Sequence, residues 1–165
     1  MKIVWQLILL AALAAAGIWL WTILFPGPEK IIRNRLAQAA SEVSFKSDEN
    51  PLVIAARAER FVAFFSTNVE VNIDLPEHGQ HSMAGREEIM QAAAGAHGMV
   101  SSLTVEFPDM NITIGPDKLS AVADVSMKVQ SAGEKEVFVQ EIKFTLQKTG
   151  GDWLITRVET VRTLS

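Results

Sequence analysis

The first constraint on this chain is an uncharged apolar block near its start. From Ile3 to Phe25 only Gln6 and Thr22 carry polar side chains, and no residue is charged. About 20 consecutive apolar residues form a helix that can cross the roughly 30 Å hydrocarbon core of a bilayer. Tryptophans lie near both ends of the block, where indole rings favour the membrane interface: Trp5, Trp19 and Trp21. The block predicts a single transmembrane helix that binds the lipid bilayer through residues 3–25.

A cleaved signal peptide is the alternative interpretation of the same block. Lys2 would be its charged start, and the alanines from Ala14 to Ala16 would be its small-residue cleavage site. Cleavage there would leave the apolar sequence GIWLWTILF at the new terminus, so an uncleaved helix is favoured. The prolines at Pro26 and Pro28 then end the apolar helix. We expect an N-terminal segment at residues 1–28 and one domain at residues 29–165.

The charges beside the block give conflicting signals about its orientation in the membrane. Lys2 precedes it, whereas Lys30, Arg33 and Arg35 follow it, and this count favours a cytoplasmic domain. A short basic start followed at once by a long apolar run is instead typical of export-type membrane anchors. We expect a single-pass protein of the inner (cytoplasmic) membrane with its domain on the outer or periplasmic side.

Composition excludes several classes of function. From Leu36 onward the chain has 11 basic and 18 acidic residues, and no basic cluster predicts a nucleic-acid partner. The chain has no cysteine, which excludes disulfides, thiol nucleophiles and thiolate metal sites.

Helical periodicity follows the proline break. Apolar residues recur at steps of three or four between Glu29 and Phe45, which predicts one helix. Asn50 can cap a second helix that begins at Pro51. Its apolar face is predicted to contain Leu52, Ala55, Ala58, Phe61, Val62 and Phe65. A third, alanine-rich helix is expected to start near Gly85.

The period then changes to two, which predicts strands. The expected strands are Val69 to Leu75, Leu103 to Ile114, Leu119 to Val129, Glu136 to Lys148 and Trp153 to Arg162. The segment from Pro76 to Gly85 is expected to be a loop. Short turns between the later strands favour antiparallel pairing, so the fold class is α+β, with a curved antiparallel sheet wrapped on helices.

This layout resembles the nuclear transport factor 2-like superfamily, which includes SnoaL-like and ketosteroid isomerase-like proteins. The resemblance rests on the element order, on AGREEI at Ala84 to Ile89, and on GGDWLITRVE at the final hairpin, and it covers residues 51–165 and, more loosely, the chain from Glu29. It implies a cone-shaped α+β barrel with an internal pocket. Members of this superfamily act as isomerases, dehydratases, transport factors and binding domains, so the resemblance leaves the function open.

Strand alternation predicts which side chains line such a cone. Trp153, Ile155, Arg157 and Glu159 share one face of the last strand, and the wall of the other strands is predicted to be almost entirely apolar. Arg157 and Glu159 would then either reach the mouth of the cone or, as is more common for ion pairs, form a cross-strand or solvent-facing pair at its rim. The predicted ligand-binding residues are Phe61, Phe65, Met127, Phe138, Gln140, Phe144, Trp153 and Arg157.

Catalytic groups are sparse in the predicted cone. The resemblance implies that an isomerase would place a tyrosine and two acids inside it, but this chain has no tyrosine. We therefore assign no catalytic residue, and only weak candidates remain: Asp74, His97, Arg157 and Glu159. His97 lies near the end of the third helix, either as a helix cap or as a base at the pocket mouth.

No cofactor and no metal site are predicted. His78 and His81, with Asp74 and Glu77 nearby, have a metal-ligand composition, but two loop histidines are more often simply exposed.

Two functions fit these observations. The first is a membrane-anchored, non-catalytic binding or assembly domain that holds a small apolar ligand. In this case the outer sheet face would form a homodimer or contact a membrane-complex partner through Val122, Val137, Val139, Leu154 and Val158. The alternative is a SnoaL-like isomerase, dehydratase or hydrolase acting by acid/base catalysis on a hydrophobic cyclic substrate. Inward-facing polar groups that converge on one cavity would favour the enzyme.

Overall fold

A computed structural model of the chain describes residues 11–17, 19, 26–75, 79–132 and 137–161. The predicted membrane helix at residues 3–25 lies for the most part outside them. Within the described residues, no helix combines the length and the apolar character needed to cross a bilayer.

Three helices form one layer of the domain. They are α2 (Pro28–Val43), α3 (Pro51–Val62) and α4 (Gly85–Met99). The predicted start of α3 is confirmed, because the Asn50 side chain accepts a hydrogen bond from the Leu52 backbone N–H at 2.9 Å. At the start of α4 the Glu88 carboxylate accepts from the Ala84 N–H at 2.8 Å. Local capping therefore fixes where two of the helices begin.

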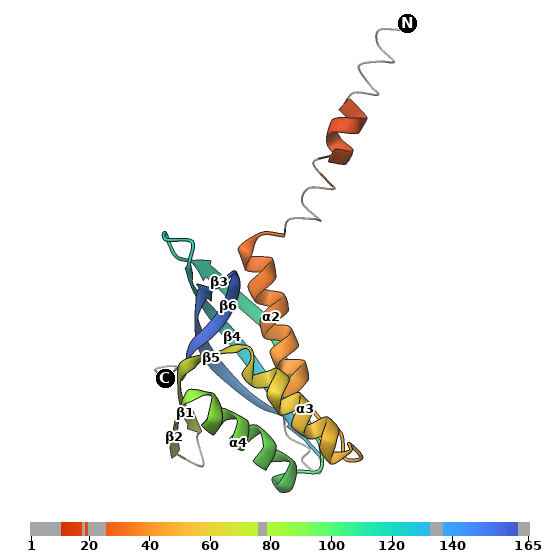
Figure 1. Cartoon of the computed structure of the whole chain (residues 1–165), viewed down its shortest axis with the longest axis vertical. Coiled ribbons are helices and arrows are strands. Elements are labelled where there is room, and N and C mark those ends of the chain that lie inside the picture. The colour runs from red at the N-terminus through yellow and green to blue at the C-terminus, as the bar shows by residue number, and fades with distance from the viewer. Residues whose placement is uncertain (1–10, 18, 20–25, 76–78, 133–136, 162–165) are drawn as a thin grey trace, which may run out of the picture.

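Six strands form the second layer. They are β1 (Phe65–Leu75), β2 (Gly79–Ala84), β3 (Leu103–Ile114), β4 (Ser120–Ser131), β5 (Phe138–Thr149) and β6 (Asp152–Thr160). The spatial order is β2-β1-β6-β5-β4-β3. The sheet curves around the helices, which lie on its concave side (Figure 1).

The expectation of a purely antiparallel sheet is wrong. β1 pairs with β6 in parallel, and the other neighbours are antiparallel. Parallel pairing is possible here because the long connection through β2, α4 and the other strands returns the chain beside its first strand. The sequence suggested antiparallel pairs because only the short turns are visible in it.

The segment after the second helix also differs from the sequence-based expectation. Phe65 starts β1 and is not part of α3, and the predicted loop from Pro76 to Gly85 contains β2. β2 was not predicted because its residues are mostly polar and exposed. Its sequence therefore lacks the alternation of apolar and polar residues that indicates a strand.

The core lies between the two layers. Ile32 and Leu36 of α2 and Trp153 and Ile155 of β6 are almost fully buried, and inward residues of β4 and β5 surround them. As predicted, Ala121, Ala123 and Val125 are buried on one face of β4 while Asp124 is exposed on the other.

Helix α2 and the two residues that follow it contact β3, the edge strand of the sheet. Arg33 donates to the carbonyl oxygen of Met110 at 3.0 Å, and the Ser44 hydroxyl accepts from the Val105 N–H at 2.9 Å. Phe45 adds two backbone hydrogen bonds to Leu103, at 2.8 and 3.0 Å. These contacts satisfy backbone groups of Leu103, Val105 and Met110 on edge strand β3, which limits pairing with other chains there.

Two adjacent isoleucines of α2 test how this helix packs against the core. Ile32 has no exposed surface, whereas Ile31 is 41% exposed. We expect Ile32→Ala to lower the free energy of unfolding by about 2–5 kcal/mol, because it leaves a cavity under the helix. Ile31→Ala should change it by less than about 1 kcal/mol. Urea unfolding of the full chain in mild detergent measures both. Equal losses for the two variants would contradict this position of α2.

Candidate functional site

An apolar cavity of about 280 Å³ lies between the helices and the sheet. Every one of its 20 lining side chains is apolar. The lining residues are Leu36, Ala39, Ala40, Val43, Phe61, Phe65, Val71, Ile73, Met83, Ile89, Ala92, Ala93, Ala96, Val105, Phe107, Met127, Ile142, Phe144, Ile155 and Val158. This volume has the scale of a site for a small organic molecule.

The cavity exists because small side chains face large ones. Three alanines of α4, Ala92, Ala93 and Ala96, form part of its helical wall, and the rings of Phe107 and Phe144 meet edge-on across the sheet, with centroids 5.7 Å apart. The alanine-rich composition of the third helix was the available signal for this wall. The sequence could not show which alanines face inward.

Half of the predicted ligand-binding residues lie in this wall. Phe61, Phe65, Met127 and Phe144 line the cavity. Trp153 is instead buried in the core, Phe138 and Gln140 are half-buried on β5, and none of the three is a lining residue among the described part of the chain.

Arg157 and Glu159 do not follow Trp153 into the cone, although Arg157 was predicted to bind the ligand there. Arg157 pairs with Thr145 and Ile155 pairs with Leu146, so Thr156 is an extra residue in the β6 ladder. A bulge of this kind reverses the alternation of the residues that follow it. Val158 is therefore buried in the cavity wall, although it was predicted to lie on the outer face.

Arg157 takes part in an exposed charge network on the outer face. Its Nη2 lies 2.6 Å from Glu70 Oε2, and its Nη1 lies 3.8 Å from Glu159 Oε1. About half of each side chain in this network is exposed, so each pair contributes at most about 1 kcal/mol.

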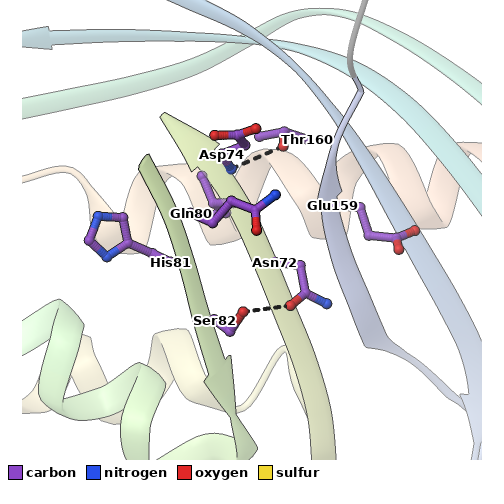
Figure 2. Close-up of a pocket in the computed structure, with 8 residues that line it drawn as sticks. Asn72, Asp74, Gln80, His81, Ser82, Glu159 and Thr160 are labelled. Carbon is purple, nitrogen blue, oxygen red and sulfur yellow. Dashed lines mark hydrogen bonds between the residues drawn. The ribbon is translucent and has the colours of Figure 1, made fainter. Parts of the chain in front are cut away.

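A polar groove of about 460 Å³ lies on the same outer face at the β2-β1-β6 end (Figure 2). It is lined by Asn72, Ile73, Asp74, Gln80, His81, Ser82, Glu159 and Thr160. The Asp74 N–H donates to the Thr160 hydroxyl at 3.0 Å, and the Ser82 hydroxyl donates to Asn72 Oδ1 at 2.9 Å. Asp74 and Glu159 thus share this groove, which has one of its eight lining residues, Ile73, in common with the apolar cavity.

Only part of the histidine and carboxylate group noted in the sequence lies within the described residues. His81 lies in this groove, while Glu77 and His78 lie outside the described residues. Among the residues that are described, no group of three or more histidine and carboxylate side chains is placed to hold a metal ion.

His97 occupies a third location, where α2, α3 and α4 meet. Its ring packs against that of Phe45 with the two planes tilted by 33° and the centroids 3.6 Å apart. Desolvation lowers the pKa of His97 below its usual 6.5, the nearby Glu49 carboxylate opposes this shift, and Arg57 adds to it. The imidazole is therefore mainly neutral at pH 7, which weakens its interpretation as a charged helix cap.

The four weak catalytic candidates are thus divided among three places. Asp74 and Glu159 are in the groove, Arg157 is in the exposed charge network, and His97 is at the helix junction. None of them lines the apolar cavity.

Solved structures share this architecture. A nuclear transport factor 2-like protein with a cystatin-like fold from Novosphingobium aromaticivorans is 17% identical, with a TM-score of 0.63 over 92% of this chain and 88% of that one. A candidate scytalone dehydratase from the same species is 14% identical, with a TM-score of 0.60 over 82% and 84%. The yeast UBP3-associated protein BRE5 is 13% identical, with a TM-score of 0.62 over 84% and 100%.

These likenesses show a nuclear transport factor 2-like fold, as the resemblance predicted. No protein-family model and no curated protein sequence matches the chain. At such low identity the similar structures define the fold and leave the activity open.

The environment of His97 gives a prediction for its titration. We expect an NMR titration to place its pKa below 6.5, and Glu49→Gln to lower it further, because that variant removes the opposing negative charge. The unfolded chain then binds this proton more tightly than the folded chain, so stability should fall as the pH drops below about 6.5. His97→Gln should remove that part of the pH dependence. A pKa above 6.5 would contradict the desolvated environment.

Proposed function

We propose that this domain binds a small apolar ligand in its cavity without transforming it, and that it does so while held at a membrane. The single observation that carries the binding proposal is the complete absence of polar side chains among the 20 described residues of the cavity wall. Transfer of apolar surface from water into such a cavity is favourable by roughly 25 cal/mol per Å². Affinity would come from burial of the ligand rather than from directional contacts.

The dispersal of the catalytic candidates supports a binding role over an enzymatic one. General acid/base catalysis needs a base within hydrogen-bond reach of the reacting atom, usually with a second polar group to stabilise charge. Asp74, Arg157 and Glu159 lie on the outer face of the sheet, and the cavity lies on its inner face.

One observation favours an enzyme as the second candidate function. His97 is a mainly neutral imidazole beside the cavity, which suits a general base. A solved structure with the same fold is described as a candidate scytalone dehydratase. A SnoaL-like isomerase, dehydratase or hydrolase acting on a hydrophobic cyclic substrate therefore stays as the alternative.

Filling the cavity tests the binding proposal. The probe is N-phenylnaphthylamine, an uncharged dye that fluoresces when it is buried in an apolar site. We expect the full chain to bind it, and Ala96→Leu to weaken binding at least about tenfold by occupying cavity space. Ala94→Leu is the matched control, because Ala94 is exposed on the same helix. No binding by the wild-type chain, or equal binding by both variants, would exclude the cavity as the ligand site.

The membrane location is proposed from the sequence alone, through the uncharged block at residues 3–25. We expect the full chain to stay with membranes during alkaline carbonate washing, and a variant lacking residues 3–25 to be released. Protease added outside intact spheroplasts should digest the domain if it lies on the periplasmic side. Release of the full chain by carbonate would disprove the transmembrane helix, and protection from protease would indicate a cytoplasmic domain.

A homodimer or membrane-complex partner on the outer sheet face is the remaining part of the proposal. Val139 is 59% exposed and Val137 is 39% exposed, and Val122 and Leu154 are half-buried on the same side. Charged and polar residues such as Asp124 and Glu141 lie between them, so the surface suits a mixed interface rather than a purely apolar one.

A further inference from the structure

A second, much smaller pocket lies where the three helices meet. Its volume is about 10 Å³, close to the space needed for one water-sized group. Three polar side chains reach it: Glu42 from α2, Arg57 from α3 and His97 from α4. We refer to it as the junction pocket.

The junction pocket and the apolar cavity share a wall. Val43, Phe61 and Ala93 line both of them. A single layer of side chains therefore separates the apolar cavity from Arg57 and His97. Phe61 is the largest member of this layer, and its ring packs edge-on against Phe65 with centroids 5.0 Å apart.

The polar groups of the junction pocket can both donate and accept hydrogen bonds. Arg57 contacts the Ser44 carbonyl oxygen and Glu49 Oε1 through Nη1, which leaves its Nε and Nη2 groups as donors within the described structure. A neutral His97 carries one donor and one acceptor nitrogen. A hydroxyl or carbonyl oxygen could therefore be bound from two sides.

Charge at the junction is already balanced. Arg57 lies 3.5 Å from Glu49, and Arg60 lies 3.0 Å from Glu42. A ligand anion would have to compete with Glu42 and Glu49 for the two arginines, and a ligand cation would meet both arginines. A small uncharged polar group fits this environment and its volume.

We propose that the junction pocket is the polar end of the apolar binding site, and that the ligand is a hydrocarbon with one uncharged oxygen function, a hydroxyl or a carbonyl. The oxygen reaches Arg57 and His97 when the Phe61 side chain changes rotamer, and the hydrocarbon fills the apolar cavity. This inference rests on the proposed binding function and specifies its ligand.

Three probes with the same chain length separate the possibilities: octane, octanol and octanoate. Binding to the full chain is followed through displacement of N-phenylnaphthylamine and through NMR shifts of His97. We expect octanol to bind about fivefold more tightly than octane, as one additional buried hydrogen bond allows. Octanoate should bind no more tightly than octane, because its charge has no unpaired partner at the junction.

Variants assign that preference to the junction pocket. His97→Phe keeps a ring against Phe45 but removes both nitrogens, and Arg57→Met removes the donors. Each should reduce octanol affinity to that of octane while octane affinity stays the same, which also shows that the cavity is intact. Glu59→Met is the control on α3, because Glu59 is exposed and does not line the pocket. It should retain the full preference for octanol.

The outcomes distinguish this inference from the binding function itself. Equal affinity for octane and octanol in the wild-type chain would overturn the proposal that the junction pocket binds the ligand oxygen. It would not contradict ligand binding in the apolar cavity. Tighter binding of octanoate would overturn the uncharged ligand class. A preference for octanol that survives both His97→Phe and Arg57→Met would also overturn the assignment. Failure of every probe to bind would refute the proposed function and this inference with it.

Discussion

The parallel pairing of β1 with β6 is the interaction on which the domain depends. It joins the β1–β2 hairpin, which precedes α4 in the chain, to the strands that follow α4. Without it the chain would have a two-stranded hairpin and a separate four-stranded sheet, with no closed concave surface between them. Val71 and Val158 are paired across this contact and both line the cavity, so the same pairing creates the candidate site.

The bulge at Thr156 decides the chemistry of that site. It turns Arg157 outward to Glu70 and places Val158 inward, which removes the one basic side chain expected in the cone. A cavity wall without charge or hydrogen-bonding groups selects ligands by volume and apolar surface. Groups that distinguish polar from apolar ligands must therefore lie behind this wall. Arg57 and His97 are such groups, and they approach the wall at the helix junction.

Much of the fold could be predicted, because its local signals are strong. Asn50 and Pro51 fixed the start of α3, and the alternation of Ala121, Ala123 and Val125 with Asp124 identified the inner face of β4. Predictions failed where a local pattern was absent or interrupted. β2 has no apolar alternation, and a one-residue bulge in β6 cannot be recognised from the composition of the strand. The same bulge explains why Arg157 does not reach the cavity that Phe61 and Phe144 line.

The sequence by itself determined the order of the elements except β2, most helix and strand positions and the apolar character of the cone, because capping, turn chemistry and periodicity act over a few residues. It also contains the membrane-length block at residues 3–25, whose role stays a proposal. Only the tertiary structure decided that β1 lies beside β6, that the catalytic candidates are dispersed, and that His97 and Arg57 meet behind Phe61. These relations join residues far apart in the chain, and their geometry depends on strand register and helix packing, which no local pattern encodes.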